Sequence, residues 1–249
     1  MSPFWRAHLL WPLAAYLAAM GLLAGMHLDV AIAQRWFFDA AGGGWLARGA
    51  FWAGDLVHTG GGLLVRAIGL VALAAWLASW RVARRAPYRR ALGYFVLALA
   101  VTNGLTGLLK RITNIDCPWD LEPFGGRFPY VGLFADRPDA LRHAACFPGA
   151  HSASGFALVA LYFVLRDLDR GRAWIGLAVG LGLGTLFAFA QEARGAHFLS
   201  HDLTSAAIAW FTSLALHALP PDRGRNLNAT RGRGNSASAA RRMRGGTSP

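Results

Sequence analysis

Six apolar stretches, each approaching the length of a membrane-crossing helix, constrain the fold of this chain more than any other feature. They are residues 9–26, 62–80, 91–109, 151–165, 173–190 and 203–219, of which the fourth is the shortest. A helix that crosses the hydrocarbon core of a bilayer needs about 20 predominantly apolar residues. We therefore expect an all-α fold, a bundle of six transmembrane helices.

The charge composition is consistent with a membrane protein. Only 15% of the 249 residues are charged, yet the formal net charge is +12. A soluble domain usually carries about a quarter charged residues, so this chain is depleted in charge although it is basic. For this reason the basic surplus does not by itself indicate a nucleic-acid partner. The chain has two cysteines, which excludes a disulfide-dense scaffold and a four-cysteine zinc site.

The distribution of arginine predicts the orientation of the bundle. Lysine and arginine in short loops collect on the cytoplasmic side of a membrane. Sixteen of the 25 basic residues lie at the two ends of the chain and in loops on one side. We therefore place both termini in the cytoplasm and the loops before the second, fourth and sixth stretches outside. An alternative is that the first stretch is a cleaved signal peptide, because Ala31 and Ala33 follow it in a small-x-small pattern.

Two segments fall outside the six stretches. Residues 31–60 are rich in aromatic side chains but are interrupted by three consecutive glycines, so we expect short amphipathic helices along the outer membrane interface. Residues 222–249 are rich in Arg, Gly, Ser, Ala and Asn and have almost nothing to bury. They are expected to form a disordered basic cytoplasmic tail after a membrane domain of residues 1–221.

Three segments that are distant in the sequence bring ionisable residues to the same outer face. The first ends the third apolar stretch with the only lysine of the chain. The second begins the fourth stretch with a histidine, and the third precedes the sixth stretch with an arginine and two histidines. These residues are Lys110, His151, Arg194, His197 and His201.

This set of residues is suited to the chemistry of phosphate esters. Fixed cations hold the oxygens of a phosphoryl group, while one imidazole attacks phosphorus and another protonates the departing alkoxide. Gly149 and Ala150 lead into a helix beginning near His151, so backbone N–H groups as far as Ser152 can approach an anion. The sequence lacks the clustered carboxylates of a metal-dependent phosphatase, and we expect neither a metal ion nor another cofactor.

The arrangement resembles the type 2 phosphatidic acid phosphatase superfamily, whose fold is shared with vanadium haloperoxidases. That family carries K-x6-R-P, P-S-G-H and S-R-x5-H-x3-D in this order, on a six-helix membrane core with the site at the outer face. The resemblance covers roughly residues 60–220. In the first motif Lys110 and Pro118 match, but Cys117 stands at the arginine position. In the second, Pro148 and His151 match, and a Gly-Ala pair replaces Ser-Gly.

The third motif departs most from the family pattern. When His197 is aligned with the family nucleophile, Gln191 stands at the arginine position and His201 at the aspartate position. Arg194 is then the natural replacement cation. If the segment is one continuous helix, Arg194, His197 and His201 form a single stripe, and His201 holds the His197 ring while Asp202 points about 140° away. A shifted alignment that makes His201 the nucleophile remains open.

The resemblance implies a role for each of these residues. His197 would form a phosphohistidine intermediate, and His151 would protonate the leaving lipid and then activate water. The phosphoryl oxygens would be held by Lys110 and Arg194, and by the N–H groups around Gly149, Ala150 and Ser152.

The two cysteines bracket the long outer loop, and each lies beside one of the motifs. Because the outer compartment permits disulfides, we expect a Cys117–Cys146 bond that draws the Lys110 and His151 segments together. The alternative is that both thiols are small apolar fillers.

The sequence thus predicts a membrane phosphatase acting on a lipid phosphate monoester or pyrophosphate at the periplasmic face of a bacterial inner membrane. Its partners would be the lipid substrate and membrane lipids, with no nucleic acid. The same residues are also compatible with two alternatives: a lipid phosphotransferase and a non-catalytic protein that binds a lipid phosphate. A transporter is disfavoured because the polar residues lie at one face and do not line a path through the helices. The sequence does not indicate the substrate lipid or the oligomeric state.

Overall fold

The computed structural model describes residues 1–133 and 135–219. Residues Met1–His217 form one compact unit, and a second unit begins at Ala218. The expected cytoplasmic tail, residues 222–249, lies outside the described residues.

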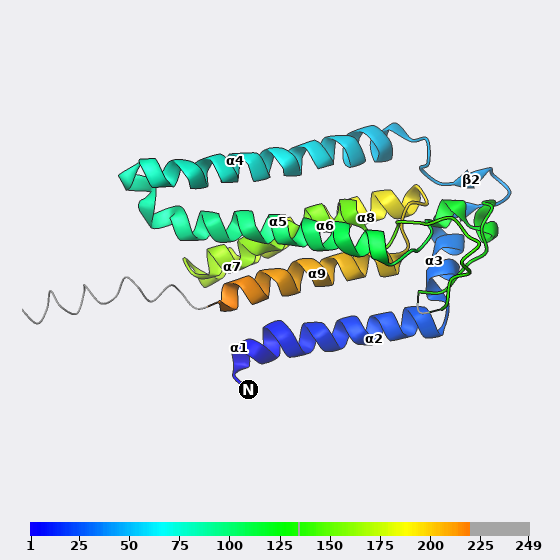
Figure 1. Cartoon of the computed structure of the whole chain (residues 1–249), viewed down its shortest axis with the longest axis horizontal. Helices are drawn as coiled ribbons and strands as arrows, with labels where there is room; N and C mark the ends of the chain where they lie inside the picture. The colour runs from blue at the N-terminus through cyan, green and yellow to red at the C-terminus, as the bar shows by residue number, and fades with distance from the viewer. Residues whose placement is uncertain (134, 220–249) are drawn as a thin grey trace, which may run out of the picture. The chain divides into compact units, whose positions relative to one another are not determined.

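The first unit is built from long helical segments, several of them made of successive helical pieces (Figure 1). The first three segments are α1 (Pro3–Trp5) with η1 (Arg6–Leu10) and α2 (Trp11–Gly25), η2 (Trp52–Gly60) with α4 (Gly61–Arg81), and η3 (Ala83–Tyr88) with α5 (Arg89–Ile112). The others are α6 (Ala150–Phe156) with η6 (Ala157–Val159) and α7 (Ala160–Arg166), then α8 (Arg170–Ala193), then α9 (Leu199–Ala218). Each of the six predicted apolar stretches falls largely within one of these segments.

Four of the described helices are long and apolar enough to cross a membrane: Pro3–Gly25, Trp52–Arg81, Ala83–Ile112 and Arg170–Ala193. Ala150–Arg166 is apolar but shorter. Helix α9 spans 20 residues but is not among the four, and it buries a run of polar side chains near its start. The chain is therefore mostly helical with four candidate membrane spans, and the count of six spans stays a prediction.

Glycines on α8 position the helix that carries His151. Gly176 and Gly180, four residues apart, face α7 and η6 across a very close contact. A Cβ atom on Gly180 would lie 2.4 Å from the backbone nitrogen of Val159, and one on Gly176 would lie 2.6 Å from the carbonyl carbon of Leu161. Small residues at this spacing let two membrane helices approach backbone to backbone. Helix α8 thus packs closely against the α6–α7 segment.

The segment expected as short interfacial helices is only partly helical. Helix α3 (Leu28–Trp36) is followed by an antiparallel hairpin of β1 (Phe38–Asp39) and β2 (Gly44–Trp45). Gly43 and Gly44 have φ values of 106° and 121°, which glycine adopts without steric cost and which a helix cannot contain. The expected helix is confirmed for α3 and is wrong for the hairpin, while the interfacial location stays a prediction. Residues 52–60 extend α4 as a π-helix.

Helix α3, the hairpin and the longest loop of the first unit lie together at one end of the long helices (Figure 1). This loop lies between α5 and α6 and contains η4 (Pro118–Asp120) and η5 (Glu122–Phe124). Aromatic side chains join these pieces into a cluster that includes Trp45, Phe124 and Phe198. The ends of α5 and α8 reach the same place (Figure 1), so this end holds the residues singled out from the sequence.

Candidate active site

The turn between α8 and α9 carries the central residues of the site. Helix α8 ends at Ala193, and Gly195 then adopts a φ of +77°, a left-handed conformation that favours glycine. A Cβ atom there would lie 2.3 Å from the Trp45 ring, so the hairpin packs directly on the turn. Because α9 begins only at Leu199, the continuous helical stripe through His197 does not form.

In the structure Asp202, not His201, is the partner of His197. His197 Nδ1 lies 2.8 Å from Asp202 Oδ1, and each side chain is only 3% exposed. The rings of His197 and His201 have their centroids 6.1 Å apart. The expected supporting role of His201 is corrected for a simple reason: the break at Gly195 redirects the chain, so the helical angle that turned Asp202 away does not apply.

Burial sets the protonation state of His197. Removal from water, together with the positive charges of Lys110 and Arg194, lowers the pKa of His197 to about 3. The ring is therefore neutral near pH 7. With the proton on Nδ1 donated to Asp202, the lone pair of Nε2 is available to react.

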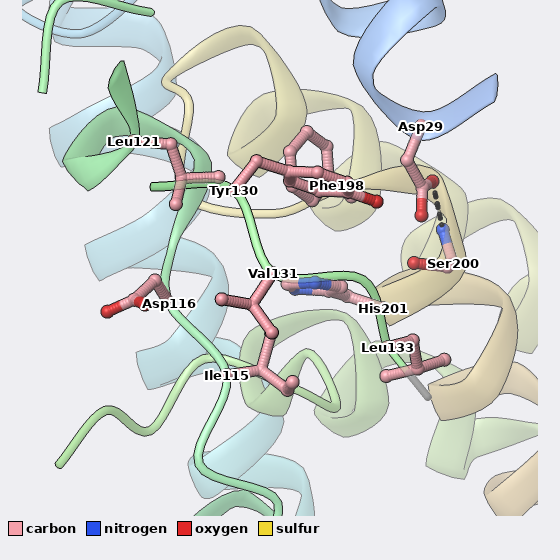
Figure 2. Close-up of a pocket in the computed structure, with 10 residues that line it drawn as sticks. All are labelled: Asp29, Ile115, Asp116, Leu121, Tyr130, Val131, Leu133, Phe198, Ser200 and His201. Atoms are coloured by element: carbon pink, nitrogen blue, oxygen red, sulfur yellow. Dashed lines mark hydrogen bonds between the residues drawn. The ribbon is translucent and has the colours of Figure 1, made fainter. Parts of the chain in front are cut away.

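His201 occupies a different environment. Its ring packs edge-on against Phe147 and Phe198, and its Nδ1 is buried without a hydrogen-bond partner among the described residues. It lines a pocket with Asp29 and Tyr130 (Figure 2). Neither Lys110, His151, Arg194 nor His197 lines that pocket.

Helix α3 contributes to the site by holding the start of α9. Asp29 Oδ1 accepts a hydrogen bond of 3.0 Å from the backbone N–H of Ser200 (Figure 2). The first N–H groups of a helix have no partner within the helix, and a carboxylate satisfies one of them. Burial raises the pKa of Asp29, although the bonds to Ser200 oppose this. The contact fixes α9 two residues before Asp202.

Gly149, from the second motif, packs directly on the His197–Asp202 pair. A Cβ atom at this position would lie 2.6 Å from Asp202 Oδ1 and 2.7 Å from His197 Nδ1. The Gly149 N–H donates to His201 O at 3.2 Å, and Ser205 Oγ donates to Gly149 O at 2.8 Å. Only glycine leaves room for the pair, which accounts for glycine at this position.

The start of α6 adds hydrogen-bond donors to the site. Ser152 Oγ lies 2.5 Å from Asp202 Oδ1 and 3.0 Å from Gly149 O, and with one proton it donates to one of them at a time. As residues of the first helical turn, Ala150, His151 and Ser152 present N–H groups that the helix itself does not use. These donors are available to an anion.

Lys110 and Arg194 are the cations of the site. Lys110 lies in the last turn of α5, is half-buried, and donates from Nζ to Cys146 O at 3.2 Å. Arg194 follows the last residue of α8 and donates to Gln191 Oε1 at 2.7 Å, while its Nε has no partner in the described part of the chain. Burial lowers the pKa of Arg194, and Asp55 opposes this. Gln191, at the motif arginine position, thus orients the replacement cation.

His151 is enclosed by aromatic rings. Its ring stacks on the Phe187 ring, with the ring centroids 4.3 Å apart and the ring planes at 20°. It also packs edge-on against the His58 ring, with the centroids 4.5 Å apart and the planes at 64°. Its Nε2 is buried and has no hydrogen-bond partner within the described residues. His58 belongs to none of the sequence motifs, and only the structure brings it to the site.

The loop between the first two motifs is closed by a disulfide. Cys117 and Cys146 are joined, with their Cα atoms 5.1 Å apart. Beside the bond, Cys146 N–H donates to Ile115 O at 2.9 Å, and Thr113 Oγ1 donates to Phe147 O at 2.5 Å. These contacts bring the end of α5 next to the start of α6.

Two carboxyl groups that the sequence did not single out for the site are part of it. Asp202 was expected to point away, and Glu192 carried no motif assignment. Both are buried, and they lie near each other. The only feature of the sequence that could have placed either residue in the site was its short distance from His197 along the chain.

In residues 1–133 and 135–219, no group of three or more His, Cys, Asp or Glu side chains is placed to hold a metal ion.

Comparison with known proteins yields one match. The sequence model of the PAP2 superfamily matches residues 91–225, more than half of the chain. The matched region runs from α5 through α9 and includes Lys110, His151 and His197. No curated protein and no solved structure matches the chain.

Proposed function

The chain belongs to the PAP2 superfamily, and we propose that it is a membrane phosphatase that hydrolyses a phosphate monoester or pyrophosphate of a lipid. Phosphoric ester hydrolysis is the general activity of that superfamily. One observation carries the proposal for this chain. A buried neutral imidazole, His197, is held by Asp202, and the positive charges of Lys110 and Arg194 act on it.

The phosphoryl group would be bound by charge and by backbone donors. Lys110 and Arg194 approach from α5 and α8, and the free N–H groups of α6 point from a helix N-terminus. Such fixed donors neutralise the charge that develops on the phosphoryl oxygens in the transition state.

In the first chemical step, His197 Nε2 attacks phosphorus. The N–P bond forms as the P–O bond to the lipid breaks, and the leaving oxygen takes a proton from His151. Asp202 accepts the hydrogen bond from Nδ1–H and stabilises the positive charge that develops on the ring. His201 faces another pocket, which supports His197 over His201 as the nucleophile.

In the second step, water attacks the phosphohistidine. His151 takes the proton of the water, the N–P bond breaks, and inorganic phosphate leaves. The protein then returns to its starting protonation state. No further reactant enters this cycle.

We further propose that the site faces the periplasm of a bacterial inner membrane, with both termini in the cytoplasm and with six spans in all. The arginine distribution and the disulfide beside the site support this side, because disulfides persist in oxidising compartments. Reporter fusions truncated after α5 and after α8 test the orientation. A cytoplasmic signal from both would contradict it.

The decisive experiment measures phosphate release by the purified protein in detergent, with a panel of lipid phosphates, with and without vanadate and a chelator. We expect release by the wild type, inhibition by vanadate and none by His197→Ala. The matched control is His143→Gln, which changes an exposed histidine in the outer loop. His151→Ala should accumulate an acid-labile phosphoenzyme from an activated aryl phosphate. Near-wild-type turnover by His197→Ala would overturn the role assignment.

Two other outcomes of this experiment favour different functions. Phosphate transfer only when an acceptor lipid is added would indicate a lipid phosphotransferase, which needs the same residues. Tight binding of a lipid phosphate without any turnover would indicate a non-catalytic binding protein.

A further inference from the structure

Arg66 is a charged residue inside one of the four candidate membrane spans. It belongs to α4 and lies within the span Trp52–Arg81, in the apolar sequence Leu-Leu-Val-Arg-Ala-Ile. A charged side chain within a membrane span costs free energy, and such residues commonly mark the path or the binding site of a substrate. We therefore looked for the group of opposite charge that Arg66 meets.

The described part of the chain supplies no carboxylate for Arg66. The ion pairs found among the described residues all involve other cations. The hydrogen bond of the exposed Arg66 side chain runs from Nε to the carbonyl oxygen of Gly62, at 3.0 Å. Because Gly62 lies one helical turn earlier, this bond turns the guanidinium toward the start of α4. The two terminal nitrogens stay available to a ligand.

This orientation brings the guanidinium near His151. A Cβ atom on Gly62 would lie 3.4 Å from Arg66 Nη2 and 3.9 Å from His151 Cε1. Both side chains thus approach the same glycine, which has no side chain of its own to separate them. Within the ring, Cε1 is bonded to Nε2, which is buried and makes no hydrogen bond among the described residues. An anion at this place can reach the guanidinium and this ring nitrogen together.

The position of Arg66 differs from that of the other two cations of the site. The charge of Lys110 acts on His197, and that of Arg194 acts on both histidines. In the proposed mechanism His197 attacks the phosphoryl group that is transferred, and His151 protonates the leaving oxygen. Arg66, beside His151, therefore adds positive charge on the side of the leaving group.

The chemistry of the leaving group decides which anion Arg66 can bind. Cleavage of a lipid phosphate monoester releases an alcohol, which gives a guanidinium no negative charge. Cleavage of a lipid pyrophosphate between its two phosphates releases a lipid monophosphate, whose anionic oxygens lie directly beside the leaving oxygen. Guanidinium groups bind phosphate oxygens in a paired, charge-assisted geometry. The place of Arg66 therefore fits a second phosphate.

We propose that Arg66 binds the inner phosphate of a lipid pyrophosphate and makes such lipids the preferred substrates, an inference that rests on the proposed phosphatase function. His197 Nε2 bonds to the terminal phosphorus as the bond from this phosphorus to the bridging oxygen breaks. The bridging oxygen keeps the electron pair, takes a proton from His151 and leaves with the lipid monophosphate. Arg66 balances the negative charge of that product, and water resolves the phosphohistidine as before.

The test compares two substrates that share one lipid chain, farnesyl pyrophosphate and farnesyl phosphate. Initial rates of phosphate release by detergent-purified protein give kcat/KM for each. Arg66→Gln should lower kcat/KM for the pyrophosphate by roughly 10- to 100-fold and for the monophosphate by less than about threefold. Arg66→Lys keeps the charge and should recover part of the loss.

The matched control is Arg81→Gln, which removes an exposed arginine from the last residue of the same helix. This variant should leave both values unchanged. Equal losses for both substrates in Arg66→Gln would assign Arg66 to the packing of the site and overturn the proposal. Unchanged values for both, as in the control, would make Arg66 a membrane anchor and would overturn it as well.

A binding measurement separates this inference from the proposed function. The probes are farnesyl methylenediphosphonate and farnesyl phosphonate, which resist cleavage and carry two and one phosphorus groups. Calorimetry should show that Arg66→Gln weakens binding of the first by roughly tenfold or more and of the second by less than about threefold. Equal weakening would overturn the role of Arg66 whether or not the protein turns over any substrate. Absence of hydrolysis of every lipid phosphate and pyrophosphate by the wild type would instead overturn the phosphatase.

Discussion

His197 Nδ1 donates a hydrogen bond to Asp202 Oδ1 over 2.8 Å, in a contact that is almost completely shielded from solvent. The pair joins the turn before α9 to the first turn of α9, and Gly195, Trp45 and α3 hold this region in place. It defines the reactive nitrogen, because Nδ1 is occupied and Nε2 is not.

Asp202→Asn should lower kcat by roughly 10²- to 10⁴-fold while leaving the protein folded. The side-chain amide keeps the volume of the carboxyl group but can donate its NH₂ to His197 Nδ1. This favours the tautomer with the proton on Nε2, which cannot attack phosphorus. The substitution also removes the negative charge that stabilises the imidazolium as it develops. Turnover of a lipid phosphate by detergent-purified protein checks this. Asp136→Asn, an exposed acid in the outer loop, is the control and should behave as wild type.

Gly149→Ala should impair both activity and stability. The added methyl group would come within 2.7 Å of the His197 ring and of Asp202 Oδ1, so one of the two must move. Overpacking of this kind costs about 1–3 kcal/mol, and displacement of the pair should lower kcat at least about tenfold.

The matched control for this change is Gly107→Ala in α5. A Cβ atom there meets nothing within 4 Å, so the variant should keep its activity. Thermal unfolding and kcat are measured for both proteins. Equal activity of Gly149→Ala and Gly107→Ala would contradict the close contact at Gly149.

Replacing both Cys117 and Cys146 by serine should destabilise the outer loop. The bond joins residues 29 positions apart, and closure of a loop of that size contributes about 3 to 4 kcal/mol on the chain-entropy model. Activity should also fall, because Lys110 donates to the carbonyl of Cys146. Thermal unfolding in detergent and non-reducing mass mapping check the two statements. Two free thiols in the wild type would refute them.

Acidification should destabilise the native protein through His197. Its pKa is lowered to about 3 in the folded state, whereas an unfolded histidine titrates near 6.5. Between these values the unfolded state binds the extra proton, so stability is full above pH 6.5 and is lost as the pH falls. From pH 6.5 to pH 5 the loss from this group is about 2 kcal/mol.

The measurement is the free energy of unfolding of wild type and His197→Asn over pH 5–7. The variant lacks the titrating ring and should show a shallower decline. Parallel curves would mean that His197 is protonated as readily in the folded protein as in the unfolded one.

Much of the helical organisation follows from local sequence. Runs of apolar residues predict the helical segments, since a helix satisfies its own backbone in an apolar environment. Boundaries were less predictable: η2 extends the second helix nine residues before the apolar run. The polar start of α9 was also outside the apolar pattern, because its side chains face the interior and not lipid.

The residue types needed for phosphate chemistry were also readable from the sequence, because they stand at helix ends in three separated segments. The lone lysine, Lys110, and the histidines His151 and His197 are placed around one site in the structure. The role of His201 was not readable. It depended on a continuous helix that the left-handed Gly195 interrupts.

The sequence by itself determined that the chain is a helical membrane protein carrying cations and imidazoles suited to a phosphoryl group, because apolar length and residue type are local properties. Only the tertiary structure decided which groups touch. The pairing of His197 with Asp202, the closeness of Gly149 and the contact of His58 with His151 depend on the direction of one turn and on packing between distant helices. A hydrogen bond requires its two atoms to lie about 3 Å apart, and no spacing along the chain sets that distance.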